Sequence, residues 1–135
     1  MEKSIDKVDL VYMIDDDSVI IYLTELIIKT VDFCKELKTF TKGEDALNTI
    51  REAAETGSKL PDLLLIDLNM PIFNGWHFLD ALQEIERAKD IPVFVFTSSI
   101  DPRDIEKSKT YPSIKDYIVK PLTIHKINKI LRYVI

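Results

Sequence analysis

The chain has 135 residues, which suits one domain, and its net charge of -5 with 46% hydrophobic residues is typical of a globular protein. This acidic balance argues against a nucleic acid or an anionic membrane surface as the main partner. The single cysteine, Cys34, excludes an internal disulfide, no apolar stretch is long enough to cross a membrane, and the charged start has no signal-peptide core, so we expect a cytoplasmic protein.

The first half of the chain predicts alternating strands and helices. The short apolar run at 10–14 predicts a buried strand, and apolar residues at helical spacing predict a helix from Ser18 to about Val31. A weaker strand at 33–40 precedes a helix from Gly43 to about Glu55. Gly57 lies where a helix would stop.

The second half continues the alternation with strands at 63–66, 93–96 and 116–119, each followed by a helix, at about 76–88, about 102–110 and 123–134. Asp101 and Pro102 are typical of a helix start. Five strand–helix units in sequence predict an α/β fold: a doubly wound, five-stranded parallel sheet with helices on both faces. We expect a single domain over residues 1–135, with its core at about 10–134.

Apolar runs in this chain stop abruptly at residues that can do chemistry. The runs end at Asp15, at Asp67, at Thr97 and at Lys120. Because the carboxyl ends of parallel strands meet at one edge of a sheet, these side chains should share one crevice, where open α/β sheets bind ligands.

The acidic residues at two of these ends indicate a metal site. Carboxylates held close together repel one another unless a cation lies between them. Oxygen ligands without His or Cys nearby favour Mg²⁺, with Mn²⁺ as an alternative. Asp15 and Asp16 form the natural pair, and Asp17 is expected to cap the helix that follows, although an Asp16–Asp17 pair stays open.

Lys120 and Thr97 supply the remaining chemistry. The Lys120 ammonium can reach a carboxylate or a phosphoryl oxygen, and the Thr97 hydroxyl can donate to the same oxygen. A carboxylate nucleophile, a divalent ion, a cation and a hydroxyl donor are the parts needed to transfer a phosphoryl group to an aspartate.

With these residues in order, the sequence resembles the receiver domain of two-component response regulators, the CheY-like family, from about Leu10 to Val134. The motifs that carry the resemblance are Asp15-Asp16, Asp67 with Met70-Pro71 and Gly75, Thr97, and Lys120-Pro121. The resemblance implies a flavodoxin-like (CheY-like) fold with strand order 2-1-3-4-5.

The resemblance also implies a role for each acidic residue. Asp67 would accept a phosphoryl group from a phosphohistidine. Asp15 and Asp16 would hold Mg²⁺ together with Asp67 and the backbone carbonyl of Asn69.

Three further roles follow from the same resemblance. Lys120 would pair with the phosphoryl oxygens, and Thr97 would move toward the phosphate on activation. Tyr117 matches the aromatic position that turns inward when the threonine moves, although it also fits an ordinary aromatic residue on an edge strand. Asn69 and Ser99 occupy positions that influence the lifetime of the phosphoryl group in this family.

The leading interpretation is a stand-alone receiver: a phosphorylation-dependent signalling switch, not an enzyme beyond its own phosphorylation and slow dephosphorylation. Its expected partners are a sensor histidine kinase or a histidine phosphotransfer protein, and a downstream protein on the face built from the fourth helix, fifth strand and fifth helix. We expect no nucleic acid and no membrane partner.

Three alternatives stay open. A phosphorelay intermediate would pass the group on to a histidine phosphotransfer protein. A Mg²⁺-dependent phosphohydrolase of the haloacid-dehalogenase kind would need a second acid two residues after the nucleophile, where this chain has Asn69. A receiver-shaped interaction module would never bind phosphate, which the intact set of site residues argues against.

Overall fold

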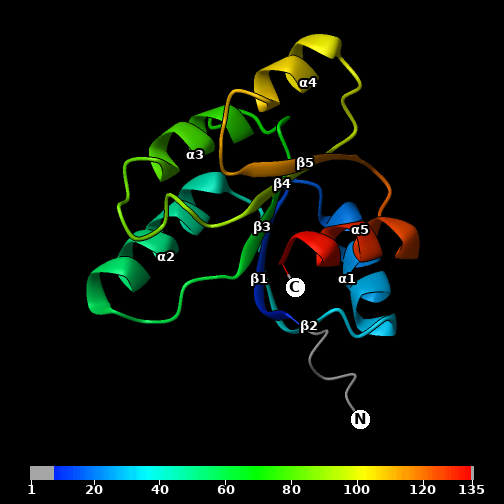
Figure 1. Ribbon diagram of the computed structural model, residues 1–135, viewed down its shortest axis with the longest axis horizontal. Helices are drawn as coiled ribbons and strands as arrows, with labels where there is room; N and C mark the ends of the chain where they lie inside the picture. Colours follow the sequence, from blue (N-terminus) through cyan, green and yellow to red (C-terminus); the bar gives the residue numbers. More distant parts are fainter. Residues whose placement is uncertain (1–7, 135) are drawn as a thin grey trace.

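A parallel five-stranded sheet in the order β2-β1-β3-β4-β5 separates two layers of helices in the computed structural model, which describes residues 8–134 (Figure 1). The flavodoxin-like topology expected from the sequence is therefore confirmed. The strands are β1 (Val8–Ile14), β2 (Cys34–Phe40), β3 (Leu63–Ile66), β4 (Val93–Thr97) and β5 (Ile114–Val119). The helices are α1 (Ser18–Thr30), α2 (Gly43–Thr56), α3 (Gly75–Leu82), α4 (Pro102–Ser108) and α5 (Ile124–Val134).

Helix α3 is shorter than the sequence predicts: it ends at Leu82, and the helix expected to reach Ala88 is wrong in its last part. The chain continues in tight turns, in which the Ile85 N–H donates to Leu82 O at 3.0 Å and the Ala88 N–H donates to Ile85 O at 2.9 Å. Successive three-residue turns keep Leu82, Ile85 and Ala88 on one side. The three-residue spacing of these apolar side chains therefore gives the same sequence pattern as a helix.

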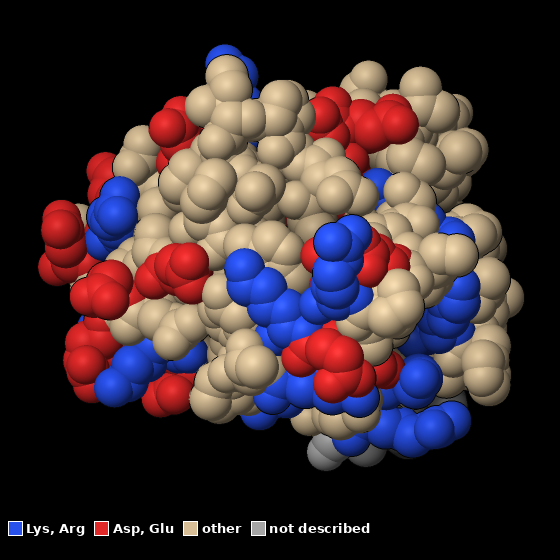
Figure 2. All heavy atoms as spheres, turned by 90° about the horizontal axis from the view of Figure 1, so that it is seen from above, with Lys and Arg blue, Asp and Glu red and all other residues tan. Residues whose placement is uncertain are grey.

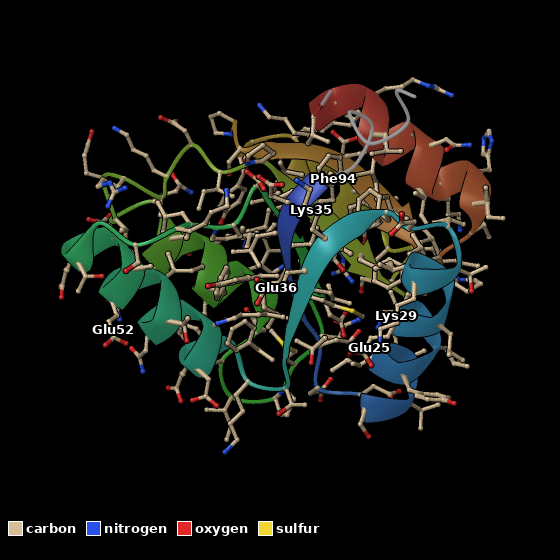
Figure 3. All side chains as sticks on the ribbon, turned by 90° about the horizontal axis from the view of Figure 1, so that it is seen from below. Glu25, Lys29, Lys35, Glu36, Glu52 and Phe94 are labelled. Atoms are coloured by element: carbon tan, nitrogen blue, oxygen red, sulfur yellow. The ribbon has the colours of Figure 1, made fainter. Side chains whose placement is uncertain are left out.

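Two apolar clusters hold the layers to the sheet. The cluster under α2 and α3 includes Ile50, Phe78 and Leu79, and the cluster under α1 and α5 includes Ile28 and Ile127. Figure 3 views the molecule from the β2 side and shows α2, with Glu52, and α1, with Glu25 and Lys29, on opposite sides of the sheet. Strands β1, β3 and β4 lie between the layers, which explains why they are nearly continuous apolar runs.

The outer strands and the surface are more polar. Strands β2 and β5 form the two edges of the sheet, and most of their side chains are only partly buried or exposed. Helix α2 carries several acidic residues, whereas α5 (IHKINKILRYV) has none, and Figure 2 shows basic side chains gathered toward one side of the face seen there. Within residues 8–134, no helix combines the length and the hydropathy that a membrane span requires.

Two helix boundaries confirm the local signals in the sequence. The Asp17 carboxylate accepts hydrogen bonds from the backbone N–H of Val19 and of Ile20 and so caps α1. Gly57 ends α2 in the left-handed conformation at φ 74°.

Candidate metal and phosphoryl-acceptor site

Three carboxylates meet where β1 and β3 end. Asp15 and Asp16 follow β1 and Asp67 follows β3, the strand paired with it, and one oxygen of each lies within 4.8 Å of the others. Asp15 is 1% exposed and Asp67 5%, whereas Asp16 faces the solvent. The register Ile14↔Ile66 places the two strand ends level, which is why these acids are neighbours.

Among the described residues, one lysine lies against this acidic group. The Lys120 ammonium lies 2.6 Å from Asp15 Oδ2 and 3.4 Å from Asp67 Oδ2, and its side chain is only 10% exposed. The Lys120 N–H donates to Thr97 O at 2.9 Å, which ties the end of β5 to the end of β4. The topology thus brings together side chains that are more than fifty positions apart in the sequence.

The charges at this site are only partly balanced. Burial raises the pKa of the Asp15 carboxyl above its ordinary value, while the Lys120 ammonium and the Asp17 N–H oppose that rise. Asp15 Oδ2 is buried and, despite its ion pair with Lys120, receives no well-directed hydrogen bond. Three carboxylates beside one ammonium leave a deficit of positive charge, which a hard divalent cation would fill.

The acids divide as the sequence predicts. Asp17 lies outside the carboxylate group and caps α1, whereas Asp15 and Asp16 both belong to it. This division favours the Asp15–Asp16 pair over the Asp16–Asp17 pair. The part that each residue, and the Asn69 carbonyl, plays in coordination stays a prediction.

The loop after Asp67 is held close to the start of α3. The Asn69 N–H donates to Asp67 Oδ1 at 3.3 Å, and the Gly75 N–H donates to Leu68 O at 3.1 Å. A Cβ at Gly75 would lie 2.5 Å from Asp67 O and 2.8 Å from Leu68 Cα, both backbone atoms. Only glycine therefore lets the helix approach the loop after Asp67 this closely.

Thr97 lies at the end of β4 and is fully buried. Its Oγ1 accepts a hydrogen bond from the Ser99 N–H at 3.3 Å and lies 3.5 Å from Asn69 Nδ2. Among the described residues, none accepts a hydrogen bond from its hydroxyl. Thr97 thus keeps a donor for a ligand that would enter the site.

Ser99 connects Thr97 to Tyr117 and to α4. The Tyr117 hydroxyl donates to Ser99 O at 2.9 Å, and the Ser99 hydroxyl donates to Asp104 Oδ2 at 2.7 Å. Burial is the main cause of the raised pKa of Tyr117, and nearby acids, including Asp104 and Asp67, add to it. Asp104 was not predicted from the sequence, although its position three residues after the helix cap Asp101 is a signal that it lies in the first turn of α4.

Comparisons with known proteins support the fold described above. A family model described as the response regulator receiver domain matches residues 11–132. A two component response regulator from Cytophaga hutchinsonii of known structure is 34% identical, with a TM-score of 0.87 over 95% of this chain and 97% of that one. The receiver domain of a sensor histidine kinase from Pseudomonas aeruginosa, solved with a magnesium ion coordinated in its active site cleft, is 16% identical, with a TM-score of 0.76 over 95% of this chain and 97% of that one.

A longer relative shows how far the similarity extends. The transcriptional regulatory protein PrrA of Mycobacterium leprae is 32% identical over 119 residues, which are 87% of this chain and 46% of PrrA. The chain therefore spans about half the length of this relative. The likeness covers less than half of PrrA and does not extend to the activity of the whole relative.

Proposed function

The chain belongs to the response regulator receiver domain family, and we propose that it is a phosphorylation-dependent switch whose phosphoryl acceptor is Asp67. The observation that carries this proposal is the grouping of Asp15, Asp16 and Asp67 within 4.8 Å, with the Lys120 ammonium against two of them. Two-component signalling follows from the family, and the acceptor, the metal and the partners are our proposal.

The residues divide the chemistry of phosphoryl transfer among them. An Asp67 carboxylate oxygen forms the new bond to phosphorus as the bond from phosphorus to the donor imidazole breaks. Lys120, already 3.4 Å from Asp67, neutralises charge on the phosphoryl oxygens, and the Thr97 hydroxyl donates to one of them.

The same carboxylates fit Mg²⁺. Asp15, Asp16 and Asp67 would hold it with the Asn69 carbonyl, as the resemblance implies, and the poorly satisfied Asp15 Oδ2 is the structural support. When bound, the ion neutralises negative charge where the phosphoryl group enters. The magnesium site of the structurally similar receiver domain from Pseudomonas aeruginosa supports the choice of metal.

A protein donor is supported by the surface beside the site. Helix α1 begins directly after the acidic residues and exposes four large apolar side chains: Val19, Tyr22, Leu23 and Leu26. An apolar helix face at the rim of the acceptor site suits docking against another helix. We propose that the donor is a sensor histidine kinase or a histidine phosphotransfer protein.

The outgoing signal would follow the Ser99 network. Movement of Thr97 toward the phosphoryl group pulls on the Ser99 N–H, and Ser99 holds both the Tyr117 hydroxyl and α4. Since Tyr117 lies on edge strand β5, its displacement changes the surface formed by α4, β5 and α5. We propose this surface as the docking site of the downstream protein.

Labelling with acetyl phosphate tests the proposal. The protein should become phosphorylated only when Mg²⁺ is present, and the label should be lost on treatment with hydroxylamine, which cleaves acyl phosphates. The variant Asp67→Asn should show no labelling, whereas Asp62→Asn, a partly buried carboxylate at the opposite end of β3, should label like the wild type. Equal labelling of Asp67→Asn and wild type would disprove the assignment of the acceptor.

A further inference from the structure

Ile72, in the loop between β3 and α3, combines two unfavourable features. Its φ is +67°, a left-handed backbone conformation that strains a β-branched residue, and its side chain is 96% exposed. Glycine or asparagine would adopt this backbone at lower cost, and a polar side chain would suit the solvent better. So exposed a side chain gains little from packing within the protein to offset either cost, which points to a contact with another molecule.

A groove lies beside this side chain. Its volume is about 390 Å³, and its lining includes Asp16, Lys42, Gly43, Met70, Ile72 and Phe73. Gly43 lets the Phe73 ring lie close to the start of α2, because a Cβ there would be 3.0 Å from that ring. Met70, Ile72 and Phe73 make the wall on the α3 side apolar, so the groove suits an apolar side chain.

The groove is continuous with the acceptor site. Asp16 belongs both to its lining and to the carboxylate group that contains Asp67. Asp67 is nearly buried, so a donor protein must cover the surface around its opening to bring an imidazole to it. The apolar face of α1 belongs to the other helical layer, on the other side of this opening.

We propose that Ile72 and this groove dock an apolar side chain of the protein that carries the phosphohistidine. This inference rests on the proposed function and names a specificity-determining contact of the same site. Ile72 presents an apolar side chain at the rim of the groove, where a matching donor covers it and a donor with a polar residue there leaves it exposed.

Three variants at this position test the proposal: Ile72→Gly, Ile72→Asn and the matched control Ile72→Val. Glycine relieves the backbone strain, and asparagine tolerates the left-handed backbone and suits the solvent. These two variants should therefore have a free energy of unfolding no lower than that of the wild type. All three should be labelled by acetyl phosphate and Mg²⁺ within twofold of the wild-type rate, because the small donor does not need the groove.

The deciding measurement is phosphotransfer from purified, autophosphorylated histidine kinase domains of the organism that encodes the chain, with the domain that labels the wild type fastest as the probe. The kcat/KM for transfer should fall about tenfold in Ile72→Gly and Ile72→Asn, mainly through KM, and stay within twofold in Ile72→Val.

The outcomes separate the two proposals. Failure of acetyl phosphate to label the wild type would overturn the proposed function itself. Normal labelling by acetyl phosphate with unchanged kinase transfer to Ile72→Gly would overturn the docking site alone. A wild-type dimer in sedimentation that Ile72→Gly dissociates, without any change in transfer, would identify the groove as a contact between copies of this chain and would also overturn the donor site.

Discussion

Phe78 on α3 and Asp15 at the end of β1 are both almost completely buried, but their surroundings are opposite in kind. Phe78 is 0% exposed and lies in an apolar cluster with α2 and the sheet. Asp15 is 1% exposed and lies beside a second acid and an ammonium, with one oxygen poorly satisfied. The apolar layer under α2 and α3 lowers the free energy of the folded chain. The charged edge of the sheet, formed by Asp15, Asp16, Asp67 and Lys120, retains a cost in free energy that a bound divalent cation would offset.

The largest expected loss of stability comes from the apolar layer. Phe78→Ala should lower the free energy of unfolding by about 3–5 kcal/mol, because it removes buried contacts and leaves a cavity. Urea unfolding followed by circular dichroism measures this change. A loss below about 1 kcal/mol would show that the layer is loosely packed and would weaken the comparison.

Substitution of Gly75, where α3 meets the loop after Asp67, should affect both the packing of the apolar layer and the chemistry of the charged edge. Gly75→Ala should cost about 1–3 kcal/mol, because its Cβ would overlap backbone atoms of Asp67 and Leu68, and it should also slow acetyl phosphate labelling. Gly57→Ala is the control, because nothing lies within 4 Å of its Cβ and only the left-handed φ is strained. Unchanged labelling of Gly75→Ala would mean that the loop after Asp67 can be displaced without loss of phosphorylation.

Magnesium should raise the free energy of unfolding of the protein by binding at the charged edge. At a concentration one hundred times the dissociation constant, the ion should raise the free energy of unfolding by about 2.7 kcal/mol, and EDTA should reverse the gain. The double variant Asp15→Asn/Asp16→Asn should lose this response while Phe78→Ala keeps it. The same increase in the double variant would place the metal elsewhere.

Tyr111 in the apolar layer is hydrogen-bonded to Asp80, an exposed acid of α3, and the response of this pair to pH should differ from that of the charged edge. The Tyr111 hydroxyl donates to Asp80 Oδ1 at 2.7 Å, and burial with that carboxylate raises the pKa of Tyr111 to about 12. Because this pKa is raised on folding, its contribution to stability is complete below pH 10 and is lost as the pH rises toward 12.

Urea unfolding between pH 9 and 12 tests this linkage. The free energy of unfolding should fall by up to about 1.4 kcal/mol for each pH unit above 10 in the wild type, and Tyr111→Phe should remove this part of the slope. A wild-type slope that Tyr111→Phe leaves unchanged would contradict the prediction.

The smallest expected effect on stability concerns the link between the charged edge and α4. Asp104→Ala removes the acceptor of the Ser99 hydroxyl and should cost about 1 kcal/mol, but it should broaden or shift the NMR signals of the Tyr117 ring. Glu106→Ala, an exposed carboxylate on the same helix, is the matched control. If the signals of the Tyr117 ring are the same in both variants, Asp104 does not influence Tyr117.

The sequence was sufficient for the order of elements, because apolar runs bounded by Asp15, Asp67, Thr97 and Lys120 mark strand ends that a parallel sheet aligns. It was not sufficient for the end of α3, since apolar residues three apart suit a helix and successive turns equally well. Nor could it show the contacts of Asp104 with Ser99, or the strained backbone of Ile72, because both depend on loop conformation.

The identity of the phosphorylated residue tests the central claim most directly. After labelling with acetyl phosphate and Mg²⁺, reduction with borohydride converts an aspartyl phosphate to homoserine, and peptide mass spectrometry locates it. We predict homoserine at position 67 alone, absent when Mg²⁺ is withheld. Homoserine at position 15 or 16, with none at position 67, would contradict the account.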